Sequence, residues 1–381
     1  MGLEEHRGYL ADANRVAAYA RAIQEVVRPG SVVLDLGCGT GVLGLLACRA
    51  GAARVYAVDE SGMIEAARRA YETNGFADRV TFVHGHSTNI ALPERVDVVV
   101  ADQIGAFAHG AGLQEVFADA RARFLKPRGR AIPSRIELYV ALVEHAETYA
   151  NVDFWSGPRA GFDFTFLHSK AVNKTHLLWL RPADLLGDPA RLCSFDPTDE
   201  PSPVLGLRAN FTARRSGTLH GLGGWFTAQL APGVRLTNSP LACDAIQRRC
   251  MFLPIERPVP LAPGSRVRVS MDILPGDDVL RWKVRPVGAA ARDAGVPQAG
   301  FSHSTFQGML TCKDEVERSR PEFVPKLVPL ARARRLVYEL CDGRRTRREI
   351  EEELRRRLPK LFRTPGHAQR FVTEIISRES Q

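Results

Sequence analysis

The sequence predicts an α/β domain with a doubly wound parallel sheet, then a β-barrel domain, then a small helical domain. Short apolar strands alternate with helical patterns over the first 130 residues, which is typical of a parallel sheet. Beyond Ile132 the pattern changes to short alternating strands separated by Pro-Gly turns, and the last 60 or so residues return to helical spacing. We place the domain boundaries at 1–130, 131–315 and 316–381.

The first domain is organised around one glycine-rich turn. The apolar strand Val33-Leu34-Asp35-Leu36 leads into Gly37-Cys38-Gly39-Thr40-Gly41, which is followed directly by an apolar helical pattern. A strand, a glycine turn and a helix in this order open a nucleotide-binding βαβ unit. The alternative is a helix-start turn whose small residues serve packing alone.

An acid at the end of the second strand supports a cofactor site. Asp59 follows the apolar run Val55-Tyr56-Ala57-Val58, where a carboxylate can accept both hydroxyls of a ribose. The glycine spacing is G-x-G-x-G, Asp35 precedes the glycines, and no P-loop Lys-Ser/Thr follows them. These features favour S-adenosylmethionine over NAD or ATP.

Composition indicates a soluble protein of two or three domains. The chain has 381 residues, 45% of them hydrophobic and 25% charged, with neither a long apolar run nor a signal pattern at the N-terminus. We therefore expect a cytoplasmic protein. Seven cysteines without a C-x-x-C pair argue against zinc and against a disulfide framework, and we expect reduced thiols, mainly in the core.

The net charge of +9 is concentrated near the C-terminus. From Lys313 onward there are 18 lysines and arginines against 12 acids. A basic tail of this kind can meet nucleic acid, an acidic peptide or neither.

The expected elements of the first domain follow from apolar periodicity. Strands are expected at 32–36, 54–58, 79–83 and 96–101, and helices at 9–27, 42–50, 61–74 and 113–124. The helix at 9–27 is expected to lie across the cofactor entrance. Ligands bind at the carboxyl ends of such strands, where Asp59, residues 84–88 and residues 102–109 fall.

The later elements are shorter. Strands of the second domain are expected at 136–143, 224–230, 266–273 and 279–284. In the tail, a helix at 330–341 ends at Asp342-Gly343, Thr346 and Glu349 form a capping box, and a last helix starts at Thr364-Pro365. Glu351, Glu352 and Glu353 each precede an arginine by four residues, which supports the middle helix. Three short helices with tight turns indicate a helix-turn-helix or winged-helix module.

Several motifs stand in one order along the chain. They are His6-x-x-Tyr9-Leu10-x-Asp12-x-x-Arg15, the glycine stretch, Val58-Asp59, Phe124-Leu125-Lys126-Pro127-x-Gly129-x-x-Ile132-Pro133, and Leu236-Thr237-Asn238-Ser239-Pro240. With these motifs the first 310 residues resemble the protein arginine methyltransferases. The resemblance implies a Rossmann-like S-adenosylmethionine-dependent methyltransferase domain, a β-barrel, and a homodimer formed through an arm on the barrel that would include Gly161-Phe162-Asp163.

The resemblance also implies roles for single residues. His6 and Arg15 would close over the cofactor, with Arg15 pairing with its carboxylate, and Ser87 and Thr88 would lie at the adenine edge. Solvated side chains and a simple polar turn are the alternatives. The expected cofactor-binding residues are His6, Arg15, Asp35, Gly37, Cys38, Gly39, Gly41, Asp59, Glu60, Ser87 and Thr88.

The substrate side departs from the family pattern. In the loop from Ala101 to Ala111, the first of two expected glutamates is Asp102 and the second is Ala111. A threonine-histidine-tryptophan triplet of the barrel is replaced by Ala245-Ile246-Gln247. Both halves of the expected arginine clamp are therefore altered.

These departures bear on the acceptor. A guanidinium stays protonated and must be held by carboxylates, whereas a neutral imidazole needs one acceptor for its N–H. Asp102 is the candidate acceptor and His109 the candidate proton acceptor, with a strand-end cap and a solvated loop histidine as the alternatives. Arginine is favoured by the resemblance and histidine by the local chemistry.

The tail resembles a second family. Leu336-x-x-Glu339-Leu340-Cys341-Asp342-Gly343-x-x-Thr346-x-x-Glu349-Ile350, with Ala368-x-x-Phe371-Val372, is similar to the small PqqD-like winged-helix domains that hold precursor peptides for modifying enzymes. A generic helical cap, a dimer contact and a DNA-binding module are the alternatives.

The leading hypothesis is an S-adenosylmethionine-dependent methyltransferase that acts on a side-chain nitrogen of a peptide or protein, with a ribosomally made precursor peptide recruited by the tail. The rival hypotheses are a small-molecule methyltransferase, a catalytically inactive binding module and a nucleic-acid binder.

Overall fold

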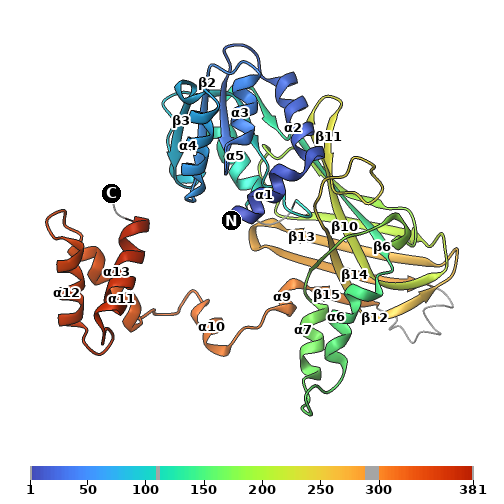
Figure 1. Cartoon of the computed structure of the whole chain (residues 1–381). Helices are drawn as coiled ribbons and strands as arrows, with labels where there is room; N and C mark the ends of the chain where they lie inside the picture. The colour runs from blue at the N-terminus through green and yellow to red at the C-terminus, as the bar shows by residue number, and fades with distance from the viewer. Residues whose placement is uncertain (1, 109–111, 288–299, 380–381) are drawn as a thin grey trace. The chain divides into compact units, whose positions relative to one another are not determined.

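A computed structural model describes residues 2–108, 112–287 and 300–379, and Figure 1 shows its elements. The chain divides into two compact units, Met1–Met309 and Leu310–Gln381. Within the described segments, no helix is both long enough and apolar enough to cross a membrane.

The N-terminus forms two helices where the sequence predicted one. α1 (Leu3–Ala11) and α2 (Ala13–Val26) are separated at Asp12, whose backbone is extended. The Asp12 carboxylate accepts the Arg15 backbone N–H at 3.2 Å and so caps α2. The prediction of one helix at 9–27 was wrong because Asp12 ends the first helix by capping the second.

The parallel sheet has the strand order β3-β2-β1-β4-β5, with every neighbouring pair parallel. Its elements are β1 (Val32–Leu36), α3 (Val42–Arg49), β2 (Arg54–Asp59), α4 (Met63–Thr73), η1 (Ala77–Arg79), β3 (Val80–His84), η2 (Ser87–Asn89), β4 (Val96–Ala101), α5 (Leu113–Arg123) and β5 (Leu125–Ile132). These bounds confirm the predicted strands and helices to within two residues. The strand order reverses at β1, so a ligand is expected at the carboxyl ends of β1 and β4.

Two antiparallel sheets follow the parallel one. Their strands are β6 (Arg135–Val143), β7 (His176–Leu178), β8 (Ala190–Phe195), β9 (Leu205–Thr212), β10 (Gly217–Ala231), β11 (Val234–Thr237), β12 (Cys250–Leu261), β13 (Arg266–Leu274), β14 (Val279–Val287) and β15 (Phe301–Ser304). One sheet runs β7-β12-β10-β6-β8, with β11 paired to β10, and the other runs β15-β14-β13-β9. A single buried apolar cluster extends from the parallel sheet into both of them. The predicted β-rich second domain is confirmed, and the shared core fixes its position against the first.

Short helices project from the antiparallel part. They are α6 (Ala146–Asp153), η3 (Phe154–Ser156), η4 (Thr165–Leu167), α7 (His168–Val172), η5 (Pro182–Asp184), η6 (Pro275–Asp277) and α9 (Thr305–Gly308). Figure 1 shows α6 and α7 side by side at one end of the unit. Phe154, Phe162 and Phe166 are exposed on this projection. It is the segment in which the resemblance placed a dimerisation arm.

The second unit is helical. It contains α10 (Lys313–Arg318), α11 (Pro329–Leu340), α12 (Arg347–Arg357) and α13 (Pro365–Glu379). Its own core is formed by α11, α12 and α13, with Val337, Leu354 and Phe362 almost fully buried. Over the described part of this unit, 310–379, there is no strand. The predicted winged-helix character is thus present only as three helices without a β-wing.

The polar details of this unit match the prediction in part. The capping box is confirmed, because Thr346 Oγ1 accepts the Glu349 N–H while the Glu349 carboxylate accepts the Thr346 N–H. Of the three expected glutamate–arginine pairs four residues apart, Glu353–Arg357 forms, whereas Glu351 pairs with Arg347.

All seven cysteines are free thiols. Cys38, Cys48 and Cys250 are buried, but Cys243, Cys312 and Cys341 are exposed, so the expectation of mainly buried thiols was wrong.

Candidate active site

A cavity of about 570 Å³ lies at the carboxyl ends of the parallel strands, beneath α1 and the start of α2. It brings together residues separated by up to 240 positions in the sequence. The predicted residues that line it are His6, Arg15, Gly37, Cys38, Gly39, Asp59, Glu60, Ser87 and Asp102. The sequence therefore located both the cavity and most of its wall.

The glycine turn forms the floor. Gly37 and Gly39 have positive φ values of 64° and 53°, which favour glycine. A Cβ at Gly39 would lie 2.5 Å from His6 Cε1, and a Cβ at Gly37 would collide with the Gln103 amide. The turn has no room for side chains at these two positions because His6 and Gln103 pack against it, and this packing places His6 at the cavity wall.

Asp59 is held at the edge of this floor. One carboxylate oxygen accepts the Gly39 N–H at 2.8 Å, and the other accepts the Ser61 N–H at 2.8 Å and its hydroxyl at 2.6 Å. A carboxylate oxygen can accept more than one hydrogen bond, so both remain able to accept ribose hydroxyls. The three donors fix the carboxylate toward the cavity.

Arg15 and Asp102 form a buried ion pair on the opposite wall. Their side chains are 9% and 6% exposed, and Arg15 Nη2 contacts Asp102 Oδ2. The Arg15 guanidinium also lies 4.2 Å above the centre of the Tyr9 ring. The sequence predicted separate tasks for these two residues, and the structure shows in addition that they pair directly.

The pair leaves hydrogen-bonding capacity unused. Within the described residues, the buried Arg15 Nε and Asp102 Oδ1 have no hydrogen-bond partner. A buried polar atom without a partner is costly, so atoms of this kind beside a cavity indicate a ligand with matching groups. S-adenosylmethionine offers a carboxylate for Arg15 Nε and hydroxyls for Asp59, so the residues present fit this cofactor.

The far wall comes from the antiparallel part. Ala245-Ile246-Gln247 reaches the start of α2, where the Gln247 N–H donates to Asp12 at 2.6 Å and the Asn14 amide donates to the Ala245 carbonyl at 3.0 Å. The next residue, Arg248, lines the cavity.

Arg248 was missed by the sequence analysis. Its guanidinium lies 5.6 Å from the centre of the Tyr9 ring and donates to the Gly105 carbonyl at 3.1 Å. Tyr9 thus contacts two cations, Arg15 and Arg248. The signal available in the sequence was the position of Arg248, directly after the altered triplet.

Asp35, Gly41 and Thr88 do not line the cavity, although they were predicted to bind the cofactor. Asp35 is fully buried beneath the turn, where its carboxylate accepts the Gly44 N–H at 2.9 Å. Gly41 begins α3, and the exposed Thr88 bonds to His86 instead. Each of the three is a sequence neighbour of residues that line the cavity, but it contacts another part of the fold.

The environment of Asp35 also perturbs its carboxyl. Burial, and then the charge of Asp59, raise its pKa to about 7, although the Gly44 N–H acts in the opposite direction. Burial thus shifts the group toward its neutral form. Its full burial and its hydrogen bond from Gly44 favour a structural role beneath the turn.

Replacing Asp35 with asparagine is expected to leave cofactor affinity within about twofold, since the amide oxygen can still accept the Gly44 N–H. The raised folded-state pKa means that wild-type stability falls as pH rises from about 4 to 7. Asp35→Asn should flatten this slope in thermal melts. A large loss of cofactor affinity in Asp35→Asn would show that Asp35 does contribute to cofactor binding.

His109 and Ala111 lie outside the described residues. The role predicted for His109 and the loss of the second glutamate at Ala111 remain predictions from the sequence.

Comparison with known proteins agrees with this architecture. Residues 33–129 match the family described as "Methyltransferase domain", and residues 134–283 match "Arginine methyltransferase oligomerization subdomain". Protein arginine N-methyltransferase 6 of Xenopus laevis is 33% identical over 251 residues, which are 62% of this chain and 73% of that protein. The histone-arginine methyltransferase CARMER of Drosophila ananassae is 28% identical over 66% of this chain and 51% of its own length.

Solved structures share the fold. The Trypanosoma brucei PRMT1 enzyme–prozyme complex with AdoHcy gives a TM-score of 0.70 at 22% identity, covering 80% of this chain and 98% of that one. Arabidopsis thaliana protein arginine methyltransferase 10 gives 0.66 at 21% identity, covering 80% and 97%.

The glycine turn, the acid at β2 and the paired antiparallel sheets, together with these matches, define an S-adenosylmethionine-dependent protein methyltransferase. This chain belongs to the protein arginine methyltransferase family.

Proposed function

We propose that this chain transfers a methyl group from S-adenosylmethionine to a side-chain nitrogen of a peptide or protein, with the neutral imidazole of histidine the first candidate and arginine the second. The observation that carries the proposal is the charge around the cavity. The Asp102 carboxylate is paired with Arg15, and a second cation, Arg248, and a second carboxylate, Glu5, also line the cavity beside Tyr9. Arginine is retained as a candidate because relatives carry that activity in their names.

The residues of the cavity have separable tasks. His6 covers the glycine turn, Arg15 Nε is available to a carboxylate, and Asp59 is available to ribose hydroxyls. Glu60 and Ser87 complete the wall on the nucleoside side. When bound, S-adenosylmethionine supplies a methyl group on a positively charged sulfur. The protein contributes mainly by holding the acceptor nitrogen within about 3–3.5 Å of that methyl, in line with the bond that breaks.

The charge balance favours a neutral acceptor. A guanidinium entering this cavity would meet Arg248 while the charge of Asp102 is already compensated by Arg15. Like charges at such short range are unfavourable, particularly in a partly buried site. A neutral imidazole needs one hydrogen-bond acceptor for its N–H, and Asp102 Oδ1 is free to provide it.

The acceptor can be identified directly. Peptides that differ only in carrying histidine or arginine at one position are incubated with the protein and S-adenosylmethionine, and tandem mass spectrometry locates the methyl group. We expect methylated histidine, with activity that falls below about pH 6.5 as imidazole is protonated. Methylation confined to arginine would show that the acceptor assignment is wrong while leaving methyl transfer itself intact.

We further propose that the second unit recruits the polypeptide substrate. The support is its own buried core, its separation from the first unit at Leu310, and the similarity of its sequence pattern to PqqD-like domains. A unit that folds around its own core can bind one part of a long substrate while another part reaches the active site.

Removing residues from about 320 onward is expected to raise the KM for a long peptide while kcat changes less than about twofold. The reason is that recruitment away from the chemistry stabilises the ground state and the transition state equally. A short acceptor fragment is the control and should be unaffected. Equal loss of turnover on both substrates would instead indicate that the unit stabilises the enzyme.

We also propose that the chain forms a homodimer through the projection at α6 and α7. Three exposed phenylalanines there offer an apolar contact that is unusual on a free surface.

A further inference from the structure

A second large cavity lies away from the active site. Its volume is about 630 Å³, and it is formed by β5, the C-terminal turn of α5, the β10–β11 turn and the segment that follows β8. Five basic side chains line it, with two acidic ones: Arg95, Arg121, Lys126, Arg128 and Arg130, with Asp196 and Asp199. A volume of this size lies within the usual range of ligand pockets.

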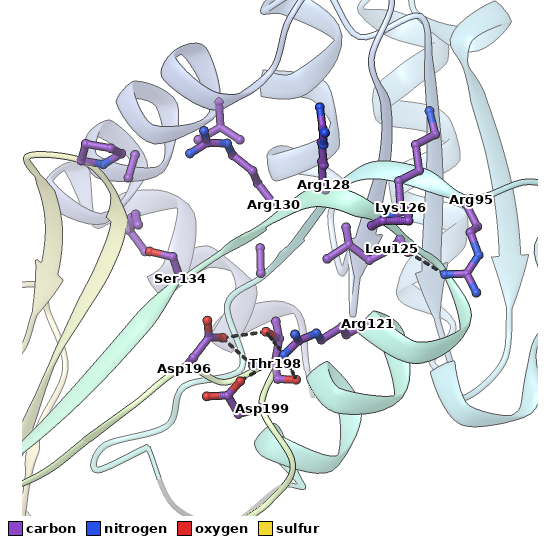
Figure 2. Close-up of a pocket in the computed structure, with 17 residues that line it drawn as sticks. Arg95, Arg121, Leu125, Lys126, Arg128, Arg130, Ser134, Asp196, Thr198 and Asp199 are labelled. Atoms are coloured by element: carbon purple, nitrogen blue, oxygen red, sulfur yellow. Dashed lines mark hydrogen bonds and ion pairs between the residues drawn. The ribbon is translucent and has the colours of Figure 1, made fainter.

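One of the two acids is paired with a cation, and the other accepts hydrogen bonds from neutral groups. Asp199 accepts the Arg121 guanidinium at 3.0 Å, and Asp196 accepts the Thr198 N–H and hydroxyl at 2.8 and 2.7 Å. Figure 2 shows these groups together at one end of the cavity. Lys126 pairs with Asp97 at 2.8 Å.

Three cations, Arg95, Arg128 and Arg130, then remain against one acid, Asp196, so the cavity keeps a net positive charge. Arg95 donates to the Leu125 and Ala122 carbonyls, which fixes its position without cancelling its charge. Arg128 and Arg130 are exposed, and their guanidinium groups have no hydrogen-bond or ionic partner among the residues that the structure describes. In Figure 2 both project from the β5 segment on the same side as Lys126, away from the two acids. The cavity therefore has a cationic end that can receive carboxylates.

We infer that this cavity docks an acidic segment of the polypeptide substrate. The wall combines cations with apolar atoms of Val26, Leu230 and Pro232, which suits a peptide containing both acidic and apolar residues. A nucleic acid fits less well, because the described residues that line the cavity include no aromatic ring on which bases could stack. Docking is independent of the methyl transfer, but the assignment of the segment to the substrate rests on the proposed function.

The position of the cavity sets a distance rule. Arg130, at the cationic end, pairs with Val98 of β4, whereas Asp102 follows the end of that strand at Ala101. The four residues from Val98 to Asp102 span roughly 13 Å at about 3.3 Å per residue. An extended peptide covers at most about 3.3–3.6 Å per residue, so the acidic segment must lie at least about four residues from the acceptor.

Binding is tested with a fluorescein-labelled peptide of eight glutamates, measured by fluorescence polarisation with the full chain and no cofactor. Arg128→Gln/Arg130→Gln is expected to weaken binding at least about fivefold at low salt, and the difference should shrink as salt is raised. The matched control is Arg266→Gln/Arg281→Gln, since both arginines are exposed on the sheet of β13 and β14. Circular dichroism establishes that both variants are folded.

Three outcomes would overturn the inference. If the control variant weakens binding of the eight-glutamate peptide as much as Arg128→Gln/Arg130→Gln does, the peptide is attracted to any basic surface. If a peptide of eight glutamines binds as tightly as the eight-glutamate peptide, charge has no role in binding. Tighter binding of a single-stranded RNA through Arg128 and Arg130 would assign the cavity to nucleic acid.

A kinetic arm separates docking from transfer. An acceptor peptide with a glutamate segment eight residues away should show a higher KM with Arg128→Gln/Arg130→Gln and an unchanged kcat. The same acceptor without the segment should be unaffected. No methylation of either peptide by the wild-type chain would contradict the proposed function, whereas methylation with equal KM values for the two peptides would contradict only the docking site.

Discussion

Asp102→Asn is expected to reduce methyl transfer by at least about 100-fold and to destabilise the protein. The carboxylate is 6% exposed and faces the buried Arg15 guanidinium, so its removal leaves a cation without a counterion. Breaking a buried ion pair from one side costs about 3–5 kcal/mol. The loss of rate follows because the acceptor N–H is no longer held by a negatively charged oxygen.

The two effects can be separated with a second variant. Arg15→Met/Asp102→Leu removes both charges, and replacing a buried pair with apolar groups is often close to neutral for stability. This variant should regain the melting temperature but not the activity. An Asp102→Asn protein with wild-type turnover would show that Asp102 supports the fold alone.

Asp59→Ala is expected to weaken cofactor binding by about 100-fold or more. The substitution removes a charged acceptor for two ribose hydroxyls, and hydrogen bonds to charged groups contribute about 1.5–3 kcal/mol each. It also releases the Gly39 N–H, so the glycine turn loses a contact that fixes it. Calorimetric titration with S-adenosylmethionine measures the change.

Ser61→Ala is the matched control for Asp59. It removes only the hydroxyl that donates to Asp59 at 2.6 Å and leaves the carboxylate in place. Affinity in this variant should fall by less than about tenfold. Unchanged affinity in Asp59→Ala would contradict the placement of the ribose.

The parts of the site that the sequence predicted are those that local chain geometry determines. A strand, a turn with glycines at 37 and 39, and an acid at 59 lie within one βαβ unit, whose geometry is nearly invariant. Their positions relative to one another follow from hydrogen bonding along the unit. The cavity floor was therefore predictable without knowledge of the rest of the fold.

The features that the sequence did not predict depend on contacts between distant segments. Arg15 and Asp102 are 87 positions apart, and nothing local indicates that they pair. Arg248 belongs to the loop between β11 and β12, and the packing of this loop against the first domain places it beside Tyr9. Asp35 shows a different limit: a carboxylate next to a glycine turn can face the ligand or the core, and only burial distinguishes the two.

Asp12 imposes a constraint on any attempt to redesign acceptor choice. Its two carboxylate oxygens accept the N–H of Arg15 and the N–H of Gln247, so α2 and the loop that leads to Arg248, each of which contributes to the cavity wall, share one anchor. Substitutions of side chains at positions 245 to 247 can leave this anchor intact, because it uses backbone atoms. Insertions and deletions displace the Gln247 N–H, and a proline at this position removes it, so each would break the contact with Asp12. We expect such changes to alter cofactor binding together with acceptor selection.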